Sequence, residues 1–108
     1  MSADVLDPAR LRDAAALAVA DLKILANPER LLLLCQLSQG ERSVGELEAL
    51  LDIRQPTLSQ QLGVLRSEGI VATRRSGKQV FYRVAKPHLL QVLATLYTIY
   101  CPKETEHD

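Results

Sequence analysis

The sequence predicts a single, mainly α-helical domain with one small β-hairpin. Apolar residues recur at helical spacing in five segments, and most of these segments begin or end at a residue that favours a helix end. Only between residues 71 and 84 does the spacing change to the alternation of strands. A chain of 108 residues with 47% hydrophobic and 4% aromatic residues can bury one modest core. We therefore expect one domain over residues 1–108, with flexible tails at about 1–8 and 103–108, that gains further burial by pairing with a second copy.

The first expected helix carries an apolar stripe that a partner helix could meet. Its members recur at spacings of three and four residues and include small alanines that allow close approach: Leu11, Ala15, Ala18, Leu22 and Leu25. The second expected helix begins at Asn27, a natural N-cap followed by Pro28, and ends at Gly40. Because its run from Leu31 to Leu37 is apolar nearly all round, we expect this helix to be buried.

Two further helices are expected to follow, separated by a short turn. Ser43 begins the third helix with a capping box, and the residues of its expected inner face are Val44, Leu47, Leu50 and Leu51. Residues 52–53 make the turn, and the fourth helix then opens with Gln55 as a side-chain cap and Pro56 at its first position. Its buried anchor is expected at Leu58, Leu62 and Leu65, and Gly69 ends it.

The outward positions near the start of the fourth helix carry short or amide side chains: Thr57, Ser59, Gln60 and Gln61. A helix that is merely solvated would more usually carry Glu and Lys there. Gln can pair bidentately with adenine, and Ser or Thr can bond several base edges. The third and fourth helices therefore read as a helix-turn-helix whose second helix enters the major groove of DNA.

A β-hairpin is expected directly after this unit. Its inward residues alternate along two strands: Val71 and Thr73 on the first, then Val80, Tyr82 and Val84 on the second. The segment from Arg75 to Lys78 joins the strands as an exposed, basic tip with a glycine. After a helix-turn-helix such a hairpin is a wing, which we expect to contact the phosphate backbone or an adjacent minor groove, although charge on an edge strand also protects it from aggregation. The fold predicted is thus a winged helix-turn-helix of five helices and a two-stranded wing, with the last helix opening at Pro87.

The formal net charge of zero hides a basic middle segment. Residues 1–53 hold five basic against nine acidic residues, a net of −4, and residues 84–108 hold two against three, a net of −1. Residues 54–83 hold six against one, a net of +5. Such asymmetry is expected of a surface that binds phosphate, but an ordinary solvated basic surface is equally compatible with charge alone. The basic residues that we assign to DNA are Arg54, Arg66, Arg74, Arg75 and Lys78.

Four segments together resemble the arsenic-repressor (ArsR) family of winged-helix regulators: Leu25–Arg30, Ser43–Leu47, Gln55–Leu62 and Val80–Tyr82. The resemblance covers nearly the whole chain, from about Ala18 to Tyr100. It implies a homodimeric repressor whose first and last helices pair while two recognition helices enter successive major grooves of a palindromic, double-stranded operator. The dimer contacts expected on this basis are Leu11, Ala15, Ala18, Leu22, Leu93, Leu96, Tyr97 and Tyr100.

The motifs with which many members of this family bind metals are missing. Residues 44–46 stand where arsenic-responsive and soft-metal-responsive members carry Cys-x-Cys. The start of the last helix reads Lys86-Pro87-His88 in place of Asp-x-His, and Ile99 and Pro102 occupy the later ligand positions. A cation and two residues without donor atoms cannot complete a tetrahedral site. We therefore expect no metal site and no cofactor, and His88 is expected to be a capping or surface residue.

Cys35, in the second helix, and Cys101, at the end of the last helix, are the only two cysteines. They are 66 residues apart, which excludes a Cys-x-x-Cys motif, so any pairing must come from the fold, which can bring both to the margin of one apolar layer. On geometry alone, two interpretations fit the sequence equally well: a pair of thiols that react together, or a core-filling Cys35 with an incidental thiol at Cys101.

The positions of these cysteines, without metal motifs, resemble the sulfide-responsive branch of the family. The resemblance implies that Cys35 and Cys101 react with persulfides or polysulfides to form a disulfide or polysulfur link that changes operator binding. A metal-responsive or generally redox-responsive regulator, and a DNA-binding regulator without thiol sensing, are the alternatives.

Other classes of protein fit the sequence poorly. No apolar run approaches the roughly 18 residues that cross a bilayer, and the N-terminus lacks the apolar stretch of a signal peptide, so we expect a cytoplasmic protein that does not bind membranes. In that reducing compartment the cysteines are expected to be thiols or redox switches. No phosphate loop, paired carboxylates or partnered nucleophile is evident, so we expect no enzymatic activity and no catalytic residues.

Overall fold

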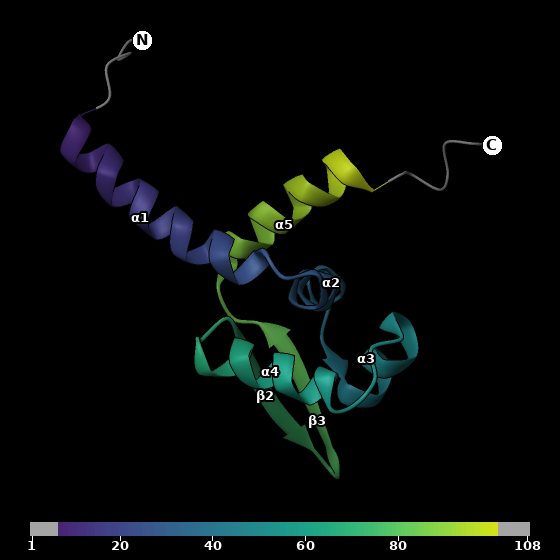
Figure 1. Cartoon of the computed structure of the whole chain (residues 1–108). Coiled ribbons are helices and arrows are strands. Elements are labelled where there is room, and N and C mark those ends of the chain that lie inside the picture. Colours follow the sequence, from purple (N-terminus) through teal and green to yellow (C-terminus); the bar gives the residue numbers. More distant parts are fainter. Residues whose placement is uncertain (1–6, 102–108) are drawn as a thin grey trace.

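The computed structural model describes residues 7–101 and has the predicted order of elements (Figure 1). The helices are α1 (Pro8–Leu25), α2 (Pro28–Leu37), α3 (Val44–Leu51), α4 (Thr57–Ser67) and α5 (Pro87–Tyr100), and the strands are β1 (Arg42–Ser43), β2 (Val71–Ser76) and β3 (Gln79–Val84). The prediction of five helices, with a β-hairpin between the fourth and the fifth, is confirmed. The two-stranded wing needs correction, because the sheet has three antiparallel strands in the order β1-β3-β2. In β1, Arg42 pairs with Tyr82 and Ser43 with Phe81; two residues are too few to show the alternation of a strand in the sequence.

The predicted starts of α2 and α3 are confirmed by their hydrogen bonds. The side chain of Asn27 accepts a bond from the backbone N–H of Arg30 at 3.0 Å at the start of α2. At the start of α3, Ser43 Oγ accepts from the N–H of Glu46 at 3.2 Å, and Glu46 Oε1 accepts from the N–H of Ser43 at 2.8 Å, which completes the capping box. Helix α1 begins at Pro8 with Asp7 as its cap, so these two residues of the expected N-terminal tail belong to the helix. The rest of the expected tails, 1–6 and 103–108, lie outside the described residues.

The core forms around α2, which has α1 and α5 on one side and α3, α4 and the sheet on the other (Figure 1). Its buried members come from every helix and from the start of β2: Leu25, Leu33, Leu34, Leu37, Leu47, Ile53, Leu58, Leu62, Leu65, Ile70, Val71, Leu89 and Leu93. Two expectations were wrong. Leu32 on α2 is 48% exposed and Leu50 on α3 is 53% exposed, because each points away from the shared core.

Helix α1 extends away from the rest of the protein (Figure 1). Most of its predicted apolar stripe is exposed, with Leu11 at 49% and Leu22 at 55%, and only Leu25 is buried. On α5 the predicted contact residues differ from one another. Tyr100 is 75% exposed, whereas Leu93 is 1% exposed and belongs to the core of the protomer, so the assignment of Leu93 to a dimer contact was wrong.

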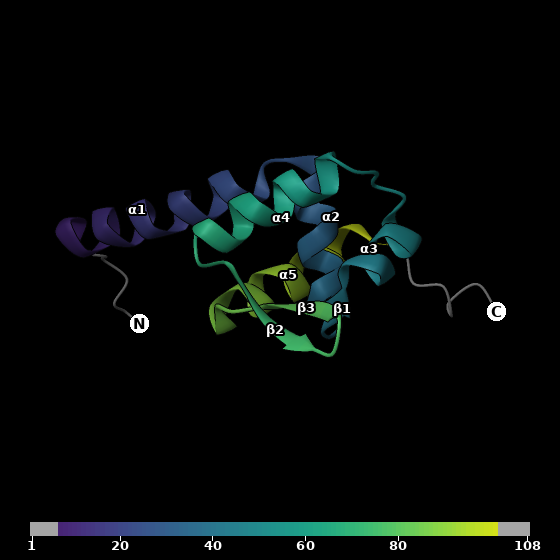
Figure 2. The same cartoon turned by 90° about the horizontal axis from the view of Figure 1, so that it is seen from below.

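The wing ends in a tight turn (Figure 2). Strands β2 and β3 pair up to Ser76 and Gln79, which leaves Gly77 and Lys78 as a two-residue connection. Gly77 has a φ of 62°, in the left-handed region that glycine adopts without steric cost, as two-residue hairpins require. None of the helices in residues 7–101 is long and apolar enough to cross a bilayer.

Candidate nucleic-acid interface and thiol groove

The start of α4 presents the predicted polar side chains at the surface. The predicted start of α4 was wrong by one residue, because Pro56 is the N-cap and the helix begins at Thr57. Gln55 precedes the cap, and its Oε1 accepts from the N–H of Ser59 at 3.1 Å and from the Ser59 hydroxyl at 2.6 Å. These bonds hold Gln55 and Ser59 to each other. Gln60 is exposed, and among the described residues we find no hydrogen bond to its side chain, so its amide is the one most available to a base edge.

Gln61 lies differently from its neighbour. It is half-buried, and its Oε1 accepts a hydrogen bond from Nη1 of Arg30 at 3.3 Å. Thr57 is also half-buried, at the margin of the core around Leu58. The sequence placed both residues on the outward face of the recognition helix. The tertiary fold turns Gln61 toward α2. The sequence could not predict this contact because its partner, Arg30, lies 31 residues away in the chain.

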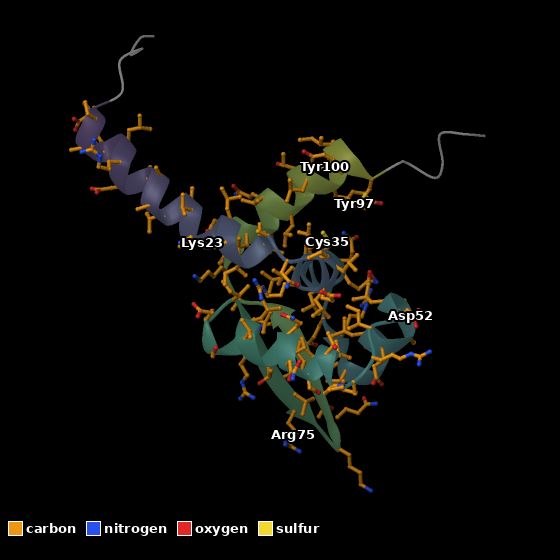
Figure 3. The ribbon with its side chains drawn as sticks, in the orientation of Figure 1. Lys23, Cys35, Asp52, Arg75, Tyr97 and Tyr100 are labelled. Atoms are coloured by element: carbon orange, nitrogen blue, oxygen red, sulfur yellow. The ribbon has the colours of Figure 1, made fainter. Side chains whose placement is uncertain are left out.

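The basic side chains of the middle segment are exposed along α4 and the wing. Arg54 precedes α4, Arg66 lies in its last turn, and Arg75 and Lys78 lie at the tip of the wing. In Figure 3, Arg75 points away from the body of the protein, on the opposite side from α1 and α5. Exposed cations on two neighbouring elements form a surface that can follow the phosphate backbone of DNA.

Arg74 is the exception among these cations because it already has two partners. Its guanidinium meets Glu41 with Nη2 to Oε1 at 2.8 Å and with Nε to both carboxylate oxygens at 2.9 Å. It also lies 4.7 Å from the ring centre of Phe81, the residue directly opposite on β3. The hydrogen bond from Arg74 lowers the pKa of Glu41 despite some opposing desolvation, and the same bond raises the pKa of Arg74. One of the five cations that the sequence assigned to DNA is thus balanced within the protein.

The two cysteines line one groove between α2 and the end of α5. Cys35 is half-buried, Cys101 is exposed, and both are free cysteines. The groove has a volume of about 450 Å³, and its other lining residues are apolar or aromatic: Pro28, Leu31, Leu32, Leu96, Tyr97 and Tyr100. Figure 3 shows Cys35 close to Tyr97 and Tyr100. The expectation that the fold can bring both sulfurs to the margin of one apolar layer is confirmed, and exposed Leu32 belongs to the same groove.

The surroundings of the half-buried Cys35 in the groove raise the pKa of its thiol. Desolvation by burial raises the pKa of Cys35, and the negative charge of a Cys101 thiolate raises it further. Cys35 is therefore a thiol at neutral pH, with little of the thiolate that reacts with electrophilic sulfur. Exposed Cys101 is the sulfur that a reagent in solution meets first.

Three polar contacts escaped the sequence analysis because their partners are distant in the chain. Nε2 of His88 lies 2.7 Å from Oδ2 of Asp21, which ties the start of α5 to α1. His88 is thus a surface residue, as expected, with a specific partner. Arg30 and Glu41, which hold Gln61 and Arg74, are the other missed residues. Over residues 7–101 there is no group of three or more His, Cys, Asp or Glu side chains that could hold a metal ion.

Comparison with known proteins places the chain among bacterial regulators. Residues 27–73 match the profile described as "Bacterial regulatory protein, arsR family". A biofilm growth-associated repressor of Agrobacterium fabrum is 64% identical over 83 residues, which cover 77% of this chain and 71% of that protein. The transcriptional activator HlyU of Vibrio cholerae is 42% identical over 84 residues, which cover 78% of this chain and 78% of that protein. The crystal structure of the repressor BigR from Xylella fastidiosa superposes with a TM-score of 0.83 at 49% identity, covering 91% of this chain and 100% of that one.

Proposed function

The chain belongs to the ArsR family of DNA-binding transcriptional regulators, and we propose that it is a homodimeric repressor whose Cys35 and Cys101 sense persulfides or polysulfides. The observation that carries the sensing role is the groove that two thiols from distant parts of the chain line together with Tyr97 and Tyr100. Relatives named as repressors support repression as the output.

The homodimer is supported by apolar surface on two helices that extend from the core. Leu17 on α1 is 73% exposed, and Ile99 and Tyr100 on α5 are 64% and 75% exposed. Large exposed apolar patches on small proteins mark surfaces that another molecule covers. Pairing of α1 and α5 across a two-fold axis would leave both copies of α4 and both wings free on the other side, as the arrangement in Figure 1 suggests.

In such a dimer the two α4 helices would enter successive major grooves of a palindromic operator. Gln60 is the proposed base-reading residue because its amide is exposed and free to pair. Arg54, Arg66, Arg75 and Lys78 are the proposed backbone contacts, which set position and affinity rather than sequence. Gln55 and Ser59 bond to each other and Thr57 is half-buried, so we assign these three residues a supporting role at the start of α4.

The sulfur chemistry follows from the different exposure of the two cysteines. The thiolate of Cys101 attacks the terminal sulfur of a persulfide RS–SH, and the S–S bond of the donor breaks. RS⁻ is the leaving group, and Cys101 becomes a persulfide. Cys35, after losing its proton to water, attacks Sγ of Cys101; HS⁻ leaves and a disulfide forms. Where Cys35 has also become a persulfide, the terminal sulfur of one persulfide attacks Sγ of the other, HS⁻ leaves, and a three-sulfur bridge remains. The donor's sulfane sulfur is the oxidant in both routes, since HS⁻ is its reduced product.

A bridge of either kind would join α2 to α5. Because α2 packs against α4 as well as α5, a new covalent tie on its outer face biases where α4 sits relative to the dimer helices. A direct disulfide needs Cα atoms within about 7 Å, whereas inserted sulfurs relax that limit. The volume of the groove, about 450 Å³, accommodates inserted sulfur atoms.

The test treats the purified protein with glutathione persulfide and, in parallel, with hydrogen peroxide, zinc and cadmium. Intact mass spectrometry should show a Cys35–Cys101 link with inserted sulfur only after the persulfide, and affinity for DNA selected from a random library should fall by about 5- to 150-fold. Cys35→Ser and Cys101→Ser should abolish the link and the change in affinity, while each variant alone keeps wild-type DNA binding. A linked protein that binds DNA as tightly as before would refute the switch, and an equal response to a metal would favour a metalloregulator.

A further inference from the structure

Arg30, at the start of α2, connects three parts of the fold through one guanidinium group. Nε donates to the carbonyl of Ile24 at 2.8 Å, and Nη2 donates to the carbonyl of Lys23 at 3.4 Å. Nη1 donates to Oε1 of Gln61 on α4 at 3.3 Å. The backbone N–H of Arg30 is itself held by Asn27 Oδ1 at 3.0 Å, so the base of the side chain is fixed as well.

The partners on α1 explain why an arginine suits this position. Ile24 and Lys23 lie in the last turn of α1, where the final four carbonyls of a helix have no partner within the helix. A cation there also interacts favourably with the negative end of the helix dipole. The planar, rigid fork of arginine can bond these carbonyls and a third acceptor at once, which a lysine ammonium on a flexible stem does less specifically. Arg30 is half-buried, and its bonds to Ile24 and Gln61 are partly shielded from water, whereas its bond to Lys23 is exposed.

The third acceptor, Oε1 of Gln61, links Arg30 to the recognition helix α4. Gln61 sits next to Leu62 on α4 and adjoins Gln60, the proposed base reader, but its own side chain points to Arg30 instead of outward. The position of the recognition helix is thereby tied to the end of α1 and not only to the apolar core. Because α1 extends away from the core as a nearly free arm, a small change in the angle between α1 and α4 becomes a larger displacement at the far end of α1 (Figure 1).

We propose that Arg30 is a positioning residue for operator recognition: by bonding the end of α1 and Gln61 together, it sets the angle between α1 and α4 and so selects the half-site spacing that the dimer accepts. This inference rests on the proposed function, in which α1 joins two protomers and each α4 reads one half-site. Half-sites read by two such helices lie one turn of DNA apart, about 34–36 Å, so the accepted spacing reports the separation of the two α4 helices.

The experiment uses the palindrome that wild-type protein selects from a random DNA library, together with derivatives whose half-sites are moved one or two base pairs closer or farther apart. Wild-type affinity should fall by at least about tenfold on each altered spacing, as expected when contacts at one half-site are lost. Gln61→Ala and Arg30→Lys should reduce that ratio to about threefold or less while keeping binding to a single half-site. Gln61→Glu, which offers Arg30 a carboxylate, should retain the wild-type ratio.

Gln60→Ala is the matched control, since it removes the same amide one residue away without touching Arg30. It should change the preferred bases and leave the spacing ratio unchanged. Thermal unfolding of each variant separates positioning from folding, because a general loss of stability would weaken all spacings equally. A wild-type spacing ratio in folded Gln61→Ala protein would overturn the positioning role alone. Selection of only single half-sites would overturn the proposed dimeric reader, and the positioning role with it.

Discussion

The ion pair between Glu41 and Arg74 predicts a variant that binds DNA with a steeper dependence on salt. Glu41→Gln removes the carboxylate that three short contacts of 2.8 to 2.9 Å hold against the guanidinium of Arg74. Arg74 keeps its place over Phe81, 4.7 Å from the ring centre, so it stays on the wing with its charge released. In the proposed dimer, each wing then gains one cation for the phosphate backbone.

The size of the effect follows from counterion release. Each new phosphate contact changes the slope of log affinity against log salt by about −0.9, so two wings add about −1.8. Between 50 and 200 mM salt, this slope corresponds to an additional loss of about 12-fold in affinity compared with wild type. The lowered pKa of Glu41 keeps the wild-type pair intact at neutral pH; the pair stabilises the fold above the ordinary carboxyl pKa, and that contribution is lost as pH falls through the lowered value.

Fluorescence anisotropy of a labelled operator, titrated at several salt concentrations and neutral pH, measures these slopes. The control is the same change in an Arg74→Gln background, where Glu41→Gln has no guanidinium to release and should leave the slope close to that of Arg74→Gln alone. Parallel lines for wild type and Glu41→Gln would refute the reasoning. An equal steepening in both backgrounds would show that the carboxylate acts on DNA directly and not through Arg74.

Three further predictions concern the groove and the last helix. In Cys101→Ser, the pKa of Cys35 should fall but stay above that of an ordinary cysteine, because burial, the larger cause of the raised value, remains while the Cys101 charge is lost. The pH dependence of iodoacetamide alkylation measures this pKa, and an unchanged value would show that the Cys101 charge does not act on Cys35. Leu93→Ala should lower the free energy of unfolding by about 2–5 kcal/mol in urea, since Leu93 is 1% exposed. Tyr100→Ala should instead weaken the dimer in sedimentation; a Leu93→Ala protein of normal stability but weakened dimer would reverse this assignment.

The order of the elements and the starts of α2 and α3 could be predicted because their signals are local. The predicted end of α2 at Gly40 and the predicted start of α4 at Pro56 were less exact, since α2 ends at Leu37 and α4 begins at Thr57. Asn27 and Ser43 bond backbone groups within three residues, so their capping roles are legible in the sequence. The third strand could not be predicted for the opposite reason. Arg42 and Ser43 become a strand only by pairing with Tyr82 and Phe81, about forty residues later.

The same division runs through the candidate site. Composition and spacing identified α4, the wing and the two cysteines. They also assigned a DNA contact to each polar or basic residue on the outward side of α4 and on the wing, without regard to partners within the protein. Gln61 and Arg74 proved to have protein partners, Arg30 and Glu41, that lie 31 and 33 residues away. Helical periodicity also could not tell the buried Leu93 from the exposed Tyr100, because both lie on the apolar part of α5.

By itself, the sequence determined the order of the helices and the hairpin, the basic segment over residues 54–83 and the two cysteines that lie outside that segment. Caps, periodicity and net charge carry that information because each depends on residues close together in the chain. Only the tertiary structure decided that Cys35 and Cys101 share one groove, and which polar side chains are held by others. Such contacts join helices and strands whose relative placement is set by packing of the common core around α2, and no local pattern in the sequence records that placement.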